Sequence, residues 1–284
     1  MDHIGCILLF YYCKEAERLT TITSRENPAV RRAVKLMTSP RERRKSGLII
    51  CEGARLCCDA AQSGVQGEEL FCTAEAMEKY ADYVEKLRER TKAAYIITED
   101  IAKKIGDTDS PQGVFLVARA PGVENDLSGL KQTGQYVLLE GLQDPSNVGT
   151  VFRTAEALGV SGVIVTENSA SCFSPKALRA GMGAMFRIPI YRTDDAPAAM
   201  RAAAARCMRP MAAVPREDAS DVTAIQFFSG AIMCIGNEGN GLTRELIEAC
   251  PEKVTIPMNG RAESLNAATA AAILMWEMMR GYIR

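Results

Sequence analysis

The sequence predicts an α/β protein of two domains, and three observations indicate this fold class. From about Asn27 onward, segments with helical spacing alternate with short apolar segments typical of strands. A strand, a helix and a strand follow one another between residues 136 and 166, which is the order of a βαβ unit with parallel strands. Ahead of this unit, residues 121–134 combine Pro, Gly, Asn, Asp and Ser with little periodicity, which is typical of a linker.

The first predicted domain covers residues 19–120 and is the smaller of the two. Its first helix extends from Asn27 to Leu36, with Pro28 in the first turn, where proline is well tolerated. We expect residues 52–64 to be helical and Ala74 to Arg90 to form one long charged helix. The expected strands are residues 47–51, 69–72, 94–98 and 113–118.

The second predicted domain covers residues 135–284, and its repeated strand–helix order favours a parallel sheet with helices on both faces. The expected helices include residues 146–158 and 196–207. The expected strands are residues 136–142, 162–166, 187–191, 210–214, 231–236 and 253–257. The last helix, residues 265–280, should pack through six apolar residues at helical spacing: Leu265, Ala268, Ala272, Ile273, Trp276 and Met279.

Charge is distributed unevenly along the chain. The formal net charge is only -1, which by itself indicates no particular partner. Between Arg18 and Arg55, however, ten Lys or Arg residues stand against three Glu, a local excess of +7. A solvated helix face explains single cations, but a group of six favours phosphate contacts with a polyanion: Arg31, Arg32, Arg41, Arg43, Arg44 and Lys45.

Cysteine and histidine usage excludes several classes of protein. The 10 cysteines are scattered through apolar segments without CxxC spacing, so we expect reduced, buried thiols in a cytoplasmic protein. His3 is the only histidine, and neither a His-ligated metal site nor a Ser-His-Asp triad can be built from it. The apolar run from Ile4 to Cys13 is too short to span a membrane and lacks the features of a signal peptide, so we expect an ordinary or mis-started amino terminus.

Three polar patches follow predicted strands of the second domain, at the carboxyl ends where open sheets bind ligands. The first is the segment 141–154, in which Asn147, Thr150 and Arg153 are spaced three apart and fall along one side of a helix. Gly149 would let another backbone approach closely. Arg153 is either a solvated residue on a capped helix or, with its rigid fork of donors, a phosphate ligand.

The second patch covers residues 174–184. Ser174 and Pro175 are expected to begin a helix, and Gly181 and Gly183 to end it. Taken alone, this pattern indicates a helix whose small residues allow tight packing, with Lys176 and Arg179 as ordinary residues of that helix.

The third patch joins a glycine-rich turn, residues 235–242, with a polar loop, residues 256–266. The turn has GxxGxG spacing and not the GxGxxG of a dinucleotide-binding fold, so we reject that interpretation. It offers flexible backbone groups and one acid, Glu238. The loop could be an ordinary connection in which Ser264 caps the last helix.

Together the three patches resemble the SpoU (TrmH-like) branch of the SPOUT RNA methyltransferases, from about Tyr136 to Arg284. The segment from Asn27 to Ser63, which includes Gly53, is similar to the SpoU substrate-binding domain, whose fold is like that of ribosomal protein L30e. The resemblance implies a mostly parallel sheet whose carboxy-terminal segment forms a deep trefoil knot, a rare exception to the rule that chains do not thread. It also implies a homodimer packed through the knotted domain.

The resemblance further implies an activity and a set of site residues. The activity is transfer of a methyl group from S-adenosylmethionine to a ribose 2'-hydroxyl of RNA, with ribosomal RNA of the 23S type preferred and the basic cluster binding that RNA. The matching cofactor positions are Gly236, Ile256, Leu265, Met258 and Asn259. The matching reaction-centre positions are Arg153, Asn147, Glu238, Ser264 and Asn266.

The implied reaction requires no metal, because the sulfonium of the cofactor already activates the methyl group. A guanidinium stays protonated in ordinary circumstances, so our hypothesis is that Arg153 stabilises the developing alkoxide or binds the adjoining phosphate. It should face a pocket that contains Glu238 and Ser264, within one subunit or across the dimer. The alternatives are methylation of a base nitrogen, a transfer RNA substrate, and a non-catalytic RNA-binding or ribosome-assembly protein of the same fold.

Overall fold

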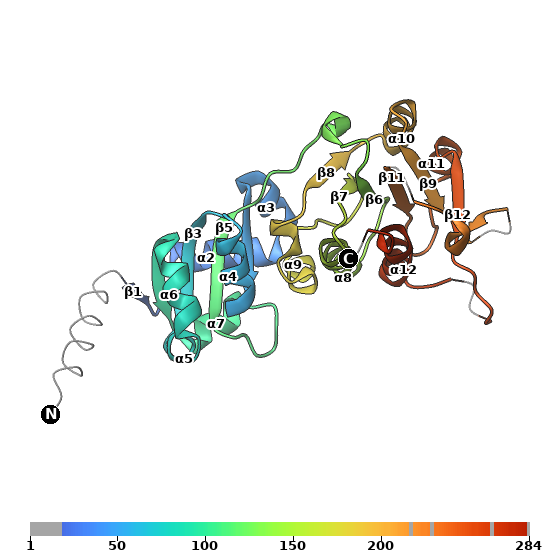
Figure 1. The fold of residues 1–284 in the computed structure, drawn as a ribbon. Coiled ribbons are helices and arrows are strands. Elements are labelled where there is room, and N and C mark those ends of the chain that lie inside the picture. Colours follow the sequence, from blue (N-terminus) through green and yellow to red (C-terminus); the bar gives the residue numbers. More distant parts are fainter. Residues whose placement is uncertain (1–18, 216–217, 228–229, 262–263, 283–284) are drawn as a thin grey trace. The chain divides into compact units, whose positions relative to one another are not determined.

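The computed structural model describes residues 19–215, 218–227, 230–261 and 264–282 (Figure 1). His3 and the apolar run Ile4 to Cys13 lie outside these residues. The chain divides into two compact units between residue 120 and residue 121. Residues 121–134, expected to be a linker, group with the second unit, where the backbone of Glu124 pairs with that of Ile190 and Arg192.

The first unit is a five-stranded mixed sheet with helices on both faces. In the sheet order β1-β4-β3-β5-β2, β4 is parallel to β1 and β3, and β5 is antiparallel to β3 and β2. The strands are β1 Leu19–Ile22, β2 Leu48–Glu52, β3 Gly67–Thr73, β4 Thr91–Ile97 and β5 Val114–Arg119. The helices are α2 Pro28–Thr38, α3 Pro40–Ser46, α4 Ala54–Gln62, α5 Ala74–Lys79, α6 Ala81–Glu89 and α7 Glu99–Ile105.

Alternation along the strands of this unit gives each face of the sheet its own core. Ile50, Phe71 and Phe115 are buried with residues of α2 and α7. Their chain neighbours, such as Cys51 and Leu70, are equally buried but point to the opposite face, because successive strand side chains alternate. Both faces are therefore covered by helices.

One local prediction for the first unit is wrong, and one helix was missed. The single long helix expected over residues 74–90 is two helices, because Tyr80 has φ -120° and ψ 33°, outside the helical region, and so ends α5 and precedes α6. The helix α3 was not expected. Its signals are present in the sequence, because Ser39 caps it, Pro40 opens it and Gly47 ends it in the left-handed region at φ 66°.

The second unit is a seven-stranded sheet in the order β10-β12-β9-β11-β6-β7-β8, and its pairings are all parallel (Figure 1). The strands are β6 Gln135–Leu139, β7 Gly162–Thr166, β8 Ile190–Thr193, β9 Arg209–Ala213, β10 Ser220–Asp221, β11 Ala231–Ile235 and β12 Glu252–Thr255. The helices are α8 Pro145–Leu158, α9 Pro175–Gly181, α10 Ala196–Ala205, α11 Arg244–Ala249 and α12 Ala267–Met279.

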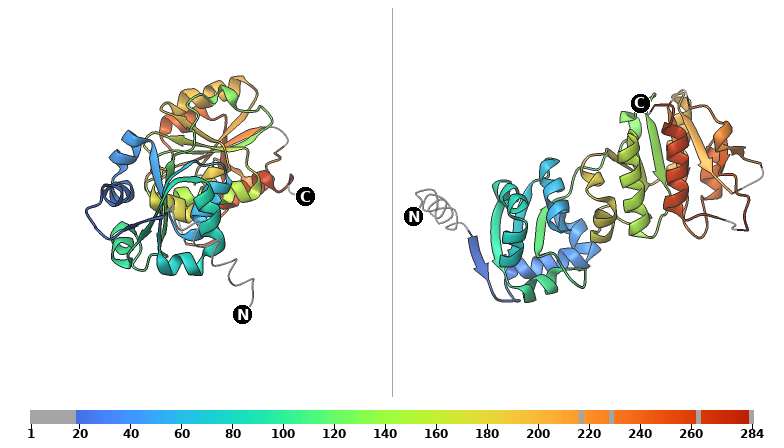
Figure 2. Two further views of the ribbon diagram at one scale, coloured as in Figure 1. Left: turned by 90° about the vertical axis from the view of Figure 1, so that its left-hand side faces the viewer. Right: turned by 60° about the horizontal axis from the view of Figure 1, so that its bottom comes forward.

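Helices cover both faces of this sheet, which confirms the predicted layering. Residues of α10 and α11 share a core with Tyr136, Ile164 and Ile232 on one face. Helices α8 and α12 pack beside each other on the other face, where the views of Figure 2 also place them. The strands β6, β7 and β11 are buried at every residue, as expected for parallel strands covered on both faces.

One change of direction in the strand order lies between β6 and β11. From β6 the chain adds β7 and then β8 on one side, whereas β11 lies on the other side of β6. Ligands of open parallel sheets bind at such a switch point, outside the carboxyl ends of the strands. The segments that leave the carboxyl ends of β6 and β11 are the first and third polar patches.

The boundaries of two predicted elements in this unit differ from the structure. The strand expected over residues 187–191 is β8, which begins only at Ile190 because Ala184 to Phe186 form a 3₁₀ turn and Pro189 follows. The last helix begins at Ala267, capped by Asn266 and not by Ser264. Its buried face also differs, since Trp276 is 50% exposed and Leu265 is 37% exposed.

No described helix is long and apolar enough to cross a membrane. The trefoil knot stays a prediction.

Candidate functional site

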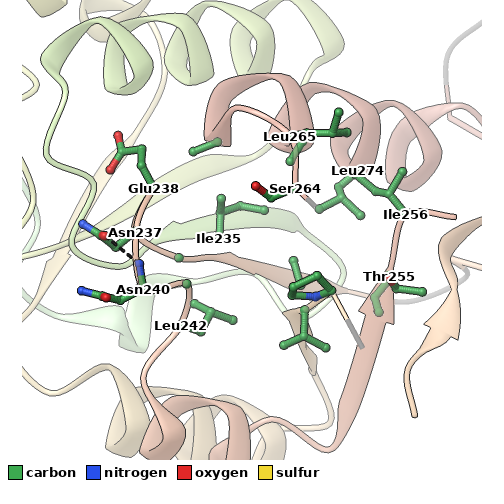
Figure 3. A pocket seen from close by; sticks show the side chains of 18 of the residues that line it. Ile235, Asn237, Glu238, Asn240, Leu242, Thr255, Ile256, Ser264, Leu265 and Leu274 are labelled. Carbon is green, nitrogen blue, oxygen red and sulfur yellow. Dashed lines mark hydrogen bonds between the residues drawn. The ribbon is translucent and has the colours of Figure 1, made fainter. Parts of the chain in front are cut away.

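A cavity of about 410 Å³ opens where the strands β9, β11 and β12 end (Figure 3). Its apolar wall includes Ala213, Leu242, Ile247 and Val254. The glycine-rich turn forms one side, and the loop ahead of α12 forms another. These are the two segments of the third polar patch, which are separated in sequence and meet in the fold.

The glycine-rich turn folds back on itself beside the cavity. The backbone N–H of Asn237 donates to the carbonyl of Gly241, and the N–H of Gly241 donates to the carbonyl of Asn237, both at 3.0 Å. A Cβ added at Gly236 would lie 2.2 Å from Gly241 C and Leu242 N, so this close return requires glycine. The side chain of Asn237 bonds out of the turn, from Nδ2 to the carbonyl of Gly141 at 2.7 Å.

A chain of hydrogen bonds links this turn to α8 and to the start of α12. Asn147 Nδ2 donates to Glu238 Oε1 at 2.9 Å, and Asn266 Nδ2 donates to Asn147 Oδ1 at 3.1 Å. Asn266 Oδ1 in turn accepts from the backbone N–H of Ala268 and Thr269. The three residues thus tie together one segment of the first patch and both segments of the third.

Glu238 is held in its charged form by this arrangement. Partial burial alone would raise the pKa of its carboxyl, but donors around the carboxylate lower that pKa below its ordinary value. The donors are the side chain of Asn147 and the backbone N–H groups of Gln143 and Asp144. In Figure 3 the carboxylate points away from the cavity, so this acid organises the cavity wall.

The predicted site residues occupy three kinds of position. Six of them line the cavity: Gly236, Ile256, Met258, Leu265, Ser264 and Glu238. A seventh, Asn147, donates a hydrogen bond to Glu238 in the cavity wall. Asn266 does not line the cavity and is connected to it through its hydrogen bond to Asn147. Asn259 is exposed and is not among the lining residues. Arg153 is exposed on α8 and does not line the cavity either. It lies six residues beyond Asn147, roughly 9 Å along the helix axis.

Sequence reasoning missed a buried acid behind the turn. Glu140, at the end of β6, is only 7% exposed, and its carboxylate accepts from both the N–H and the hydroxyl of Thr243, each at 2.7 Å. The available signal was a carboxylate directly after a fully apolar strand, a position that requires a hydrogen-bonding partner. The apolar cavity residues of β9 were also missed, although they too lie at a strand's carboxyl end.

The second polar patch has the structural role expected of it. Helix α9 begins at Pro175 with Ser174 as its cap and packs tightly on α8. A Cβ added at Gly149 would lie 2.4 Å from the carbonyl oxygen of Ala177, so the close backbone approach predicted there is confirmed. Lys176 pairs with Asp144, the residue that caps α8. The patch therefore holds α8, and with it Asn147, in place.

The predicted basic cluster lies on α2 and α3 and divides into two groups. Arg32 pairs with the buried Glu69, and Arg43 donates to the carbonyls of Leu36 and Met37 at the end of α2. Burial, and to a lesser degree the neighbouring charge, lowers the pKa of the Arg43 guanidinium. The other four side chains are exposed and have no ion-pair partner within the described part of the first unit: Arg31, Arg41, Arg44 and Lys45.

The cysteines largely follow the expectation. Of the eight in the described residues, seven are buried and Cys207 is exposed, in the turn between α10 and β9 with φ 63°. Burial raises the pKa of the Cys51, Cys72 and Cys172 thiols to about 12, which keeps them protonated and unreactive. No cluster of three or more metal-ligating side chains occurs in the ranges that the structure describes.

Comparison with known proteins covers nearly the whole chain. The 23S rRNA (guanosine(2553)-2'-O)-methyltransferase RlmP of Bacillus subtilis is 30% identical, over 90% of this chain and 98% of the relative. The 23S rRNA (uridine(2479)-2'-O)-methyltransferase of Streptomyces viridochromogenes is 29% identical, over 91% of both. The AdoMet-bound rRNA methyltransferase from Sinorhizobium meliloti is 27% identical with a TM-score of 0.82, over 94% of this chain and 100% of that one.

Family models account for both units separately. Residues 27–116 match the MRM3-like substrate binding domain. Residues 134–276, which contain all three polar patches, match the SpoU rRNA Methylase family. The chain belongs to the SpoU rRNA methylase family.

Proposed function

We propose that this protein transfers a methyl group from S-adenosylmethionine to a ribose 2'-hydroxyl of ribosomal RNA. One observation carries the proposal: in a SpoU-family chain, the cavity at the carboxyl ends of β9, β11 and β12 is lined by the turn 236–242 and by four residues between β12 and α12, Ile256, Met258, Ser264 and Leu265. Two relatives named as 23S rRNA 2'-O-methyltransferases support the substrate class, and the AdoMet-bound relative supports the cofactor. Residues 19–120 would bind the substrate, residues 121–134 would form the linker, and residues 135–284 would carry the reaction.

The cavity suits this cofactor in size and in lining. Its volume of about 410 Å³ lies in the range of small-molecule sites, roughly 300–1,000 Å³. Leu242, Ile247 and Val254 offer an apolar surface for an adenine ring, and the turn at Gly236 brings backbone groups to the rim. Bound there, S-adenosylmethionine supplies a methyl group already activated by the sulfonium.

The residues around the cavity would then position the ribose and respond to its charge. A ribose hydroxyl is weakly acidic, so the oxygen's developing negative charge must be stabilised. We assign this role to Arg153, through the alkoxide or the adjoining phosphate. The Ser264 hydroxyl lies beside the cavity in Figure 3, where it can hydrogen-bond a bound group. Glu238, Asn147 and Asn266 hold the wall against which the reactants lie.

A homodimer would bring Arg153 to a cavity that it does not line in its own chain. Helices α8 and α12 pack together, and Arg153 on α8 and Trp276 on α12 are both exposed. A Trp side chain that is 50% exposed suits an interface. We therefore infer that α8 and α12 pack against a second copy and that the partner's Arg153 completes the site. Sedimentation should show a dimer that Trp276→Glu dissociates, whereas a wild-type monomer would contradict the inference.

Binding of RNA would rest on the four cations of the predicted cluster that are exposed and have no ion-pair partner in the described part of the first unit, Arg31, Arg41, Arg44 and Lys45. Phosphate contacts release counterions, so affinity should fall steeply with salt concentration. Arg32 and Arg43 belong to the predicted cluster but already serve intramolecular contacts, so we expect less from them. They would shape the surface that Arg44 and Lys45 present.

Methyl transfer from labelled S-adenosylmethionine tests the proposal directly. The purified protein is incubated separately with ribosomal RNA and transfer RNA from cells that lack the gene. We expect label in ribosomal RNA, recovered in alkali-resistant dinucleotides, because a 2'-O-methyl group blocks alkaline cleavage. Label in an alkali-labile nucleotide would indicate base methylation, label in transfer RNA alone would overturn the substrate, and cofactor-independent RNA binding without transfer would indicate a non-catalytic protein.

A further inference from the structure

The turn that closes the cavity has little intrinsic stiffness. Three of its residues, Gly236, Gly239 and Gly241, are glycines, which lose more backbone entropy on ordering than any other residue. A wall of this kind binds a small molecule tightly only when it is ordered beforehand, because ordering during binding reduces affinity. Contacts that fix the turn therefore bear on cofactor binding.

The turn is fixed at both ends to the segment that follows β6. At its beginning, Asn237 Nδ2 donates to the carbonyl of Gly141, and the N–H of Glu140 donates to the carbonyl of Ile235 at 2.9 Å. At its end, both donors of Thr243 bond to the carboxylate of Glu140. Within the described residues, Glu140 is thus the only side chain of β6 or of the segment after it that forms hydrogen bonds with Thr243, at the end of the turn.

The environment of Glu140 makes this contact specific. The side chain is 7% exposed, and no Lys or Arg within the described residues forms an ion pair with it. A buried carboxylate requires hydrogen-bond donors, and Thr243 supplies two to its two oxygens. Movement of the turn's end would break both bonds at once and leave the carboxylate buried without them.

We propose that Glu140 is a positioning residue that holds the turn 236–242 in its cofactor-binding conformation. The inference rests on the proposed function, because it takes the cavity to be the S-adenosylmethionine site. Glu140 is not among the residues that line the cavity, so it acts through Thr243 and the turn. Its loss should weaken cofactor binding while leaving RNA binding unchanged.

The first unit offers a matched control. Glu52 is also a buried strand-end acid, 8% exposed, and its carboxylate accepts from the N–H of Asp107 and the hydroxyl of Thr108. Glu140→Gln and Glu52→Gln therefore remove the same charge from the same kind of donor pair, one behind the cavity and one in the other unit. A general effect of losing a buried acid would appear in both variants.

Calorimetric titration with S-adenosylmethionine tests the inference on the full chain. We expect Glu140→Gln to raise Kd about tenfold, and Glu52→Gln to leave it within about twofold. In steady-state assays Glu140→Gln should raise KM for the cofactor and not KM for RNA. Faster hydrogen exchange over residues 236–243 in Glu140→Gln should accompany the change.

Thr243 gives a second route to the same answer if Glu140→Gln does not fold. Thr243→Ser keeps both donors and should bind like the wild type, whereas Thr243→Val loses the hydroxyl and should bind more weakly. Equal cofactor affinity in wild type, Glu140→Gln and Thr243→Val would overturn the inference and leave the proposed function standing. A wild-type protein that binds no S-adenosylmethionine would instead overturn the proposed function.

Discussion

The substitution Asn147→Asp probes the hydrogen-bond chain that joins three segments of the site. It preserves the shape of the side chain and the acceptor that Asn266 uses, but replaces the donor facing Glu238 with a second carboxylate oxygen. Two carboxylates would then face each other across the 2.9 Å that now separates Asn147 Nδ2 from Glu238 Oε1. We expect a destabilised second unit and weaker cofactor binding at neutral pH.

The expected magnitude follows from two contributions. The lost hydrogen bond to a charged group contributes about 1.5–3 kcal/mol. The repulsion of two charges about 3 Å apart is about 1.4 kcal/mol in water and roughly four times that at a protein surface. Since Glu238 is exposed to solvent, we take the screened value. The sum, about 3–4.5 kcal/mol, corresponds to a Tm lower by roughly 6–18 °C for a unit of this size.

The pH dependence of this loss has a definite sign. In the wild type the pKa of Glu238 is lowered, so its contribution to stability is present above the ordinary carboxyl pKa and is lost on acidification. In Asn147→Asp one carboxyl of the facing pair has a raised pKa, because like charges disfavour ionisation. That pair is therefore stable when it shares a proton and loses stability as the pH rises. The difference in the free energy of unfolding between variant and wild type should therefore become smaller as the pH is lowered from about 8 to about 5.

Urea unfolding of wild type and variant at both pH values measures this difference. Asn240→Asp is the matched control, because it makes the same change in the same turn without a side-chain contact to Glu238 in the described structure. A variant as stable as the wild type at neutral pH, or a deficit that grows on acidification, would refute the contact between Asn147 and Glu238.

Three further predictions concern packing, subunit exchange and RNA. Gly149→Ala places a Cβ 2.4 Å from the carbonyl oxygen of Ala177 and should lower the free energy of unfolding by about 1–3 kcal/mol. In the control Gly159→Ala the new Cβ meets no atom within 4 Å, so only the positive φ should matter, at about 1 kcal/mol. Thermal melts that rank the two variants equally would contradict the packing of α8 on α9. Mixing inactive Arg153→Ala with inactive Gly236→Val should restore about one quarter of wild-type methyl transfer. Half of the dimers in such a mixture contain one intact cavity that faces one intact arginine of the other subunit. No recovery of activity would place Arg153 in the site of its own chain. Arg44→Ala should weaken RNA binding and flatten its salt dependence with cofactor affinity unchanged, and an unaltered salt slope would remove this residue from the interface.

The fold was predictable where local pattern and burial agree. The strands β6, β7 and β11 are buried throughout and mostly apolar, and their order with α8 predicted the parallel sheet. Predictions were wrong where a single backbone conformation decides the outcome, as at Tyr80, whose non-helical angles divide one expected helix into two. The buried face of α12 was misjudged at Trp276 because spacing alone does not tell which apolar stripe faces the chain's own core and which remains uncovered.

The site was predictable as a set of residue types but not as a set of contacts. Glycines, amides and one acid after strand ends indicated where Glu238 and Ser264 would lie, and both line the cavity. The bond from Asn147 to Glu238 spans 91 positions, and no local pattern encodes such a pairing. Arg153 stands apart from the cavity because helical periodicity assigns a side of α8 and not the distance to the turn. Its role stays a prediction.

The close packing of α8 against α9 also restricts which substitutions this sequence can accept during evolution. Residue 149 can gain a side chain only if the backbone at Ala177 and the methyl group of Ala180 give way, since both lie within 2.7 Å of where that side chain would begin. Because Asn147 is two residues away on the same helix, any such adjustment would also displace an amide of the site. Variation at position 149 should therefore occur together with variation along α9, although neither Gly149 nor α9 has a chemical role in the proposed reaction.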